Sequence, residues 1–199
     1  MIKWTVAGLM LISLTSCGMV GGPVSGVVVD AETRQPIEGA YVVAQWSGSS
    51  SVSIAESQTV CIYTDMAKTD EKGRFRIPMW FFQKPGITGQ RQNVEIYKPG
   101  YLPETGSRSD EYGISTSQSS INERVDYMMA VRGRATCRGN EEPEKNLLAL
   151  INALYEESKA LAGVEYDSNI VEPFLYSKEE LIFGYTRAQE LRKKRWSSQ

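Results

Sequence analysis

The hydrophobic pattern divides the chain into a short apolar leader, a β-rich middle and a helical tail. In the middle part, apolar and polar residues alternate over short stretches, which is typical of strands with one buried face. Residues Ala40, Val42, Ala44 and Trp46 would share such a face. We predict strands at 24–30, 40–46, 59–68, 74–77, 93–97 and 127–131.

Two polar stretches interrupt this pattern and are predicted as loops. Residues 48–53 are rich in serine, and residues 102–122 are dominated by Ser, Gly, Asp and Glu. The second stretch is long for a loop in a compact domain, so we expect a mobile or functional excursion. The aromatic residues Trp80, Phe81 and Phe82 either pack in the core or form a binding surface for a sugar or peptide.

The tail changes to a helical period after Cys137. Apolar residues repeat at helical spacing from Leu147 to Leu161, and Gly163 follows them. We predict a second helix from Ser177, where Glu180 would complete a capping box. The basic run 192–195 would then lie at its C-terminal end, solvated or in contact with anionic lipid.

The leader has the layout of a secretory signal peptide. Lys3 precedes a mostly apolar run that ends near Leu14, which is too short to cross a bilayer, since about 20 residues are needed. The following Leu-Thr-Ser-Cys17 resembles the lipobox of bacterial lipoproteins. That resemblance implies cleavage before Cys17 and acylation of its sulfur, with palmitate-type chains holding the protein to a membrane. The alternative is an ordinary signal peptide with a cysteine nearby by chance.

Four segments follow from this reading of the sequence. Residues 1–16 would be the signal peptide, 17–23 a lipidated flexible tether, 24–136 a β-domain and 137–199 a helical extension. Gly18 replaces the Asp that usually retains such lipoproteins in the inner membrane. We therefore expect the cell envelope, with the outer membrane facing the periplasm favoured in a Gram-negative organism.

Composition restricts the possible chemistry. The net charge of −2 argues against nucleic acid as a partner, and 41% hydrophobic residues suit a globular protein. The chain has no histidine, which excludes Ser-His-Asp and Cys-His catalysis and His-ligated zinc. Nor do the motifs Ser-x-x-Lys, Gly-x-Ser-x-Gly or the phosphate-binding loop occur. Asp65, Asp70 and Glu71 lack the EF-hand spacing for calcium. We predict no catalytic residue, metal or cofactor.

Two cysteines remain once Cys17 is acylated. In an oxidising compartment Cys61 and Cys137 would form a disulfide; the alternative is a pair of free, buried thiols. The bridge would close a loop of about 76 residues, for which chain entropy gives about 4–5 kcal/mol of stabilisation.

The β-domain resembles carboxypeptidase regulatory-like domains over residues 24–132. Three blocks occur in the family's order, and they comprise Gly26, Val28, Asp30, Pro36, Ile37, Gly39, Ala40 and Val42, then Thr69, Asp70, Gly73, Phe75 and Ile77, then Val94, Ile96, Gly100 and Tyr101. The resemblance implies a mainly β fold, a transthyretin-like Greek-key β-sandwich followed by two helices. The matched residues are turn and core positions. Peptidase activity is not implied, because the zinc domain is absent.

We therefore expect a non-enzymatic binding or structural module, anchored to a membrane and contacting an envelope protein or carbohydrate. The alternative is an envelope hydrolase or transferase that uses a carboxylate pair from Asp110, Glu111 and Glu123. A third possibility is that the tail docks a partner helix, although packing on its own sandwich explains the apolar stripe more simply.

Overall fold

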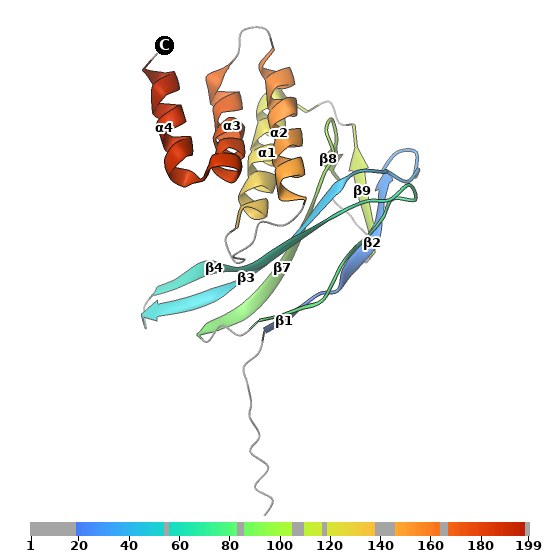
Figure 1. Ribbon diagram of the computed structural model, residues 1–199. Helices are drawn as coiled ribbons and strands as arrows, with labels where there is room; N and C mark the ends of the chain where they lie inside the picture. The colour runs from blue at the N-terminus through green and yellow to red at the C-terminus, as the bar shows by residue number, and fades with distance from the viewer. Residues whose placement is uncertain are drawn as a thin grey trace, which may run out of the picture.

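The computed structural model describes residues 19–53, 56–82, 86–104, 110–116, 119–137, 146–163 and 167–197. They form two facing sheets, a short two-stranded ribbon and a layer of helices (Figure 1). The strands are β1 (Met19–Gly21), β2 (Val24–Asp30), β3 (Tyr41–Ser53), β4 (Glu56–Lys68), β5 (Arg74–Ile77), β6 (Trp80–Phe82), β7 (Ile87–Tyr97), β8 (Leu102–Pro103) and β9 (Glu111–Ser115). The helices are α1 (Ile121–Ala135), α2 (Leu147–Ala162), α3 (Ser168–Phe183) and α4 (Tyr185–Trp196).

The central sheet has the order β4-β3-β7 and is antiparallel throughout. The first half of its middle strand, β3, is buried on both faces, because the helices cover one side and the second sheet covers the other. Val42 and Trp46 belong to the sandwich core between the sheets, whereas Tyr41 and Val43 belong to the helix-side core. The predicted shared face of Ala40, Val42, Ala44 and Trp46 is confirmed.

The predicted serine-rich loop at 48–53 is wrong. These residues extend β3 into a long hairpin with β4, in which Ser49 pairs with Thr59 and Ser51 with Ser57. Ladder hydrogen bonds come from the backbone, so a polar strand away from the core can pair without an apolar pattern to reveal it.

The second sheet has the order β5-β2-β9-β8. Strand β9 runs parallel to β2 and comes from the stretch predicted as a long excursion, so that prediction is wrong for residues 111–115. Its Ile114 is buried in the sandwich core beside Val28, Phe75 and Ile77. The alternation in β9 is too short to stand out from its polar surroundings.

The turn residues of the family-like blocks stabilise tight turns. The Asp30 carboxylate accepts from the backbone N–H of Glu32 and Thr33 at 3.1 and 2.8 Å. Between the sheets, the buried Thr69 hydroxyl donates to the Ile37 carbonyl at 2.7 Å and accepts from Ala40 N–H at 2.8 Å. These contacts fix the chain crossings that enclose the sandwich core.

The described chain contains four helices, so the expected two-helix extension is wrong. Residues 127–131 were predicted as a strand, but they lie inside α1, whose buried residues Arg124, Met128, Val131 and Ala135 repeat at helical spacing. A capping box between Ser120 and Glu123 begins this helix. Because α1 precedes Cys137, the helical layer begins before the boundary expected at residue 137.

The helix predicted from Ser177 begins earlier, whereas the helix predicted from the apolar repeat between Leu147 and Leu161 is confirmed as α2. Asp167 caps α3 by accepting from Asn169 N–H at 2.9 Å. Ser177 lies within α3, and its hydroxyl donates back to the Pro173 carbonyl at 3.1 Å instead of capping a new helix. Gly184, with φ of 82°, separates α3 from α4.

The architecture is therefore mixed, with a substantial β part and a helical layer on the outer face of the central sheet. The helix-side core joins β3, β4 and β7 to α1, α2 and α3 through Met66, Tyr97, Met128, Leu150 and Phe174. Within the described residues, no helix is long and apolar enough to span a membrane.

Candidate functional site

Cys17, the predicted lipidation site, lies outside the described residues. Strand β1 begins two residues later at Met19 and pairs antiparallel with β6, with Val20 opposite Phe81 and Gly21 opposite Trp80. Residues 19–21 were expected in a flexible tether, and that part of the prediction is wrong. The fold thus begins close to the candidate anchor point.

Of the aromatic residues at 80–82, one packs in the core and another is exposed, so the core interpretation holds for the first and the binding surface stays a prediction for the second. Trp80 is 7% exposed and packs in the sandwich core, stacked on Tyr63 at 4.9 Å between ring centroids and edge-on to Trp46 at 5.5 Å. Its indole Nε1 is buried without a hydrogen-bond partner. Phe81, in contrast, is 63% exposed, and the side chain of Phe82 lies outside the described residues.

Gly21 permits this close packing of the ribbon on the core. A Cβ at this position would lie 2.2 Å from the Trp80 Nε1 and 2.6 Å from the Trp46 Nε1, closer than any real contact. The β1–β6 ribbon is therefore held firmly on its inner side. On its outer side Met79 is 65% exposed, next to the exposed Phe81. We call Met79, Phe81 and the strand pair β1–β6 the entry ribbon.

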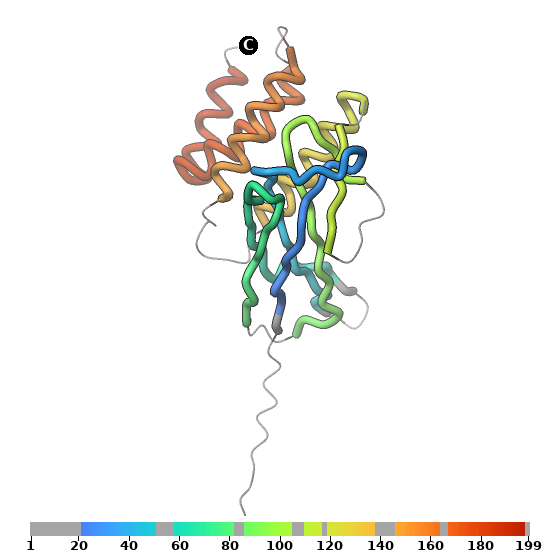
Figure 2. The backbone as a smooth tube through the Cα atoms, turned by 90° about the vertical axis from the view of Figure 1, so that its right-hand side faces the viewer, coloured from blue at the N-terminus to red at the C-terminus, as the bar shows by residue number. Residues whose placement is uncertain are grey.

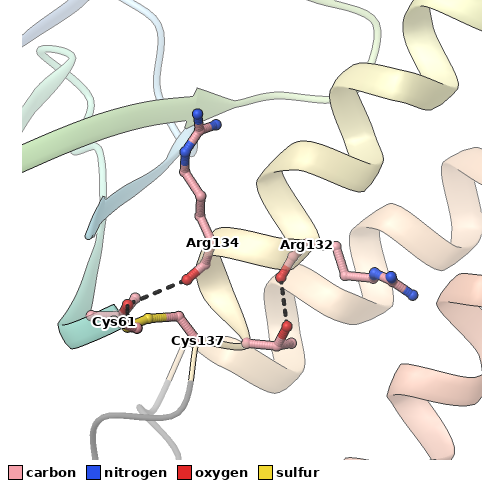
Figure 3. Close-up of a disulfide and its surroundings, with 6 residues drawn as sticks. Cys61, Arg132, Arg134 and Cys137 are labelled. Atoms are coloured by element: carbon pink, nitrogen blue, oxygen red, sulfur yellow. Dashed lines mark hydrogen bonds between the residues drawn. A yellow bond between two sulfur atoms is a disulfide. The ribbon is translucent and has the colours of Figure 1, made fainter. Parts of the chain in front are cut away.

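Cys61 and Cys137 are joined in the structure as a disulfide with their Cα atoms 6.1 Å apart (Figure 3). Cys61 lies in β4 at the edge of the central sheet, and Cys137 directly follows α1. Nearby, the Thr64 hydroxyl donates to the Arg134 carbonyl at 3.3 Å. The bridge would tie the C-terminal end of α1 to the sheet on which it packs.

A buried ion pair that the sequence analysis missed links α1, α2 and the end of β7. The Arg124 guanidinium binds both carboxylate oxygens of Glu157 at 2.8 Å, with side-chain exposures of 6% and 10%. Glu157 also accepts from the Tyr97 hydroxyl at 2.6 Å and from Gly100 N–H at 3.0 Å. The four donors compensate for the burial of the carboxylate.

These contacts shift the pKa of the Glu157 carboxyl and of the Tyr97 hydroxyl. Burial alone would raise the pKa of Glu157, but hydrogen bonds from Arg124, Tyr97 and Gly100 lower it below its ordinary value. Burial and the hydrogen bond to Glu157 raise the pKa of Tyr97, so its hydroxyl stays protonated as a donor. Arg124 also donates to the carbonyls of Lys98 and Tyr101, which fixes the family-like Gly100-Tyr101 turn against α1. With every strong donor and acceptor paired within the fold, this network serves structure.

A second charged network binds α4 to α3 and accounts for part of the basic run 192–195. Arg195 forms hydrogen bonds with Glu172 at 3.0 Å and with Glu179 at 2.6 Å. Partial burial alone would lower the pKa of Arg195, but the hydrogen bonds to Glu179 and Glu172 raise it above its ordinary value. Arg192 stacks near the rings of Tyr176 and Trp196. Only part of the basic run is therefore available to a partner.

A pocket of about 410 Å³ lies beside this network, between the first two turns of α3 and the C-terminal end of α4. Trp196 is 62% exposed and presents a large aromatic surface there. The cationic Arg192 and the polar groups of α3 complete a lining suited to a polar ligand with one flat apolar face. We call this hollow the α3–α4 pocket; it is lined by Ser168, Asn169, Glu172, Pro173, Arg192 and Trp196.

The three carboxylates of the enzymatic alternative occupy separate structural settings. Glu111 in β9 forms an ion pair with Arg34, and Glu123 closes the capping box of α1 with Ser120. Asp110 lies in the turn before β9, where its carbonyl accepts from Val27 N–H at 3.0 Å. In the part of the chain that the structure describes, no group of His, Cys, Asp or Glu is placed to hold a metal ion.

No family model, curated protein or solved structure matches this chain. The resemblance to carboxypeptidase regulatory-like domains and to lipoproteins therefore rests on the sequence motifs.

Proposed function

We propose that the chain is a lipid-anchored protein of the bacterial cell envelope that acts as a non-enzymatic binding or structural module. Its β-part would be a transthyretin-like sandwich that connects a membrane anchor at Cys17 to a helical layer. Such a protein needs its attachment point and its presenting surface at different ends of a rigid body.

The arrangement of the two ends is the observation that carries this proposal. Strand β1, where the described chain begins, lies at one end of the sandwich, and the helices lie at the other end in both views (Figures 1 and 2). The predicted acylated residue precedes β1 by only two positions. An anchor there would leave α3 and α4, with the α3–α4 pocket, pointing away from the bilayer.

The α3–α4 pocket supports a binding role at the distal end. It combines an exposed indole with a guanidinium and the polar side chains of Ser168 and Asn169, whereas the Glu172 carboxylate in its lining is bound by Arg195. Exposed Trp beside Arg is a common feature of protein-binding surfaces, and an indole face also stacks on sugars. We therefore propose an envelope protein or a carbohydrate as the partner.

The anchor is tested by labelling cells that express the full chain with radioactive or alkyne-tagged palmitate. The protein should incorporate label and fractionate with membranes, whereas Cys17→Ser should lose both properties. Cys61→Ser is the matched control, because it removes a cysteine without touching the anchor and should keep the label. If Cys17→Ser retains label and membrane association, the envelope assignment fails.

The distal binding role is tested by photo-cross-linking in living cells. A photoreactive phenylalanine analogue at Trp196 should yield a discrete adduct that is reduced by Arg192→Ala, while the same probe at Glu71, an exposed turn residue, should not. Equal adducts from both positions would contradict a specific role for the pocket.

A further inference from the structure

The entry ribbon carries an exposed apolar surface that the fold does not use. Met79 and Phe81 are the most exposed large hydrophobic residues among those described, at 65% and 63%. They flank Trp80, which is buried and stacked against the core. Because successive side chains of an extended backbone point to opposite faces, Met79 and Phe81 point away from the core. The fold therefore holds two large apolar side chains in solvent at one end of the molecule.

The position of this surface close to the candidate anchor indicates what could cover it. Phe81 pairs with Val20, three residues after Cys17. Two residue steps between Cys17 and Met19 span at most about 7 Å, so acyl chains on Cys17 would bring β1 to the headgroup region of the bilayer. Aromatic and thioether side chains at that depth are favourable, because the interface accepts apolar groups that water does not.

We propose that Met79 and Phe81 of the entry ribbon insert into the bilayer interface and orient the anchored protein on the membrane. The proposal rests on the lipid anchor at Cys17 and adds to it a specific contact surface. A lipid chain alone is a flexible attachment, whereas two insertion points beside it fix which end of the sandwich faces the bilayer. The occupant is lipid.

The test uses single-cysteine labelling of the full-length, lipidated protein in protein-free vesicles of phosphatidylethanolamine and phosphatidylglycerol. With Cys17 acylated and Cys61 bonded to Cys137, a cysteine introduced by Met79→Cys or Phe81→Cys would be the only free thiol. A polarity-sensitive fluorophore is attached there, and vesicles with and without nitroxide-labelled lipid are compared. Glu71→Cys and Lys193→Cys are the controls, both exposed and away from β1 and β6.

Labels at positions 79 and 81 should shift to shorter emission wavelength and lose about half of their intensity to nitroxide lipid. Labels at 71 and 193 should be unaffected. If the vesicle-bound protein shows no more quenching at 79 and 81 than at the controls, the insertion is wrong and the anchor stands. If the unmodified full-length protein does not float with vesicles, the anchor itself is wrong.

A protein partner would give a different result. The labels at 79 and 81 would then be shielded in native envelopes but remain aqueous in protein-free vesicles, which would overturn the lipid assignment. The two substitutions report independently, and each replaces an exposed side chain, so folding can be verified from the circular dichroism of each variant.

Discussion

Replacing Arg124 by Met should destabilise the protein strongly, because it leaves the Glu157 carboxylate buried without its cation. Glu157 has four donors, two from Arg124 and one each from Tyr97 and Gly100. The substitution removes the two charged donors but keeps much of the side-chain volume. Breaking a buried pair from one side costs about 3–5 kcal/mol, and at 6% and 10% side-chain exposure solvent screens little of this.

The free energy of unfolding is measured by urea denaturation near neutral pH on the non-lipidated mature chain. Arg187→Ala is the control, since its ion pair with Glu190 is 63% and 57% exposed and should contribute less than about 1 kcal/mol. The double variant Arg124→Met, Glu157→Leu should recover much of the loss, because no unpaired charge remains buried. A loss for Arg124→Met no larger than that of the surface control would refute the reasoning.

The pH dependence gives an independent check on the same group. The pKa of Glu157 is lowered in the folded state from an ordinary value of 4.5, so its contribution to stability is complete above that value. The contribution is lost as pH falls through the folded-state pKa. As pH falls below about 4.5, the wild type should therefore lose more stability than the double variant, whose curve lacks this group. Parallel curves would show that Glu157 does not carry the effect.

Three further predictions follow from other parts of the fold. Cys61 and Cys137 should resist alkylation until reduced, as shown by intact mass, and reduction should cost up to about 4–5 kcal/mol by chain entropy; two thiols free without reductant would disprove the bridge. Trp80→Ala should lower the free energy of unfolding, measured by urea denaturation, by about 3–5 kcal/mol, whereas Phe81→Ala should lower it by about 0.5 kcal/mol or less. Similar losses for the two variants would contradict the different burial of the two side chains. Arg195→Ala should loosen the attachment of α4 and lower the free energy of its local opening by about 1–3 kcal/mol, which is measured as faster amide hydrogen exchange in α4. Unchanged exchange would show that apolar packing alone holds the helix.

The sequence predicted the parts of the fold in which burial produces a regular pattern. Val42, Ala44 and Trp46 alternate because one face of β3 meets the second sheet, and α2 shows its stripe because it packs against α1 and α3 in the helix-side core. The turn residues Asp30 and Asp70 were also readable, because their side chains bond the local backbone and need no distant partner.

The failures have physical causes that differ from element to element. Residues 127–131 contain adjacent apolar residues that suit a strand, and the sequence signal for the helix is the capping box of Ser120 and Glu123. The serine-rich end of β3 is held by backbone pairing with β4, which leaves no side-chain signal. Strand β1 is paired by residues 80–82, about sixty positions away, so its local glycine-rich composition suggested a tether.

The candidate sites were predictable to a smaller extent. The motif at Cys17 is local and can be read directly from the sequence. The burial of Trp80 and the exposure of Phe81, in contrast, depend on how β6 pairs. The Arg124–Glu157 network joins residues 33 positions apart on two helices, and one of those helices was not expected. Likewise the α3–α4 pocket exists only because Gly184 folds α4 back on α3.

The double burial of β3 has a consequence for how the molecule can be divided. Cutting the chain near residue 136, where a domain boundary was expected, would remove α2 and α3 from the helix-side core, which also includes Val43, Met66 and Tyr97. A fragment ending there would keep α1 on the sheet but expose the apolar side chains of this core that α2 and α3 cover, and it should aggregate. Sandwich and helices should thus melt in a single transition.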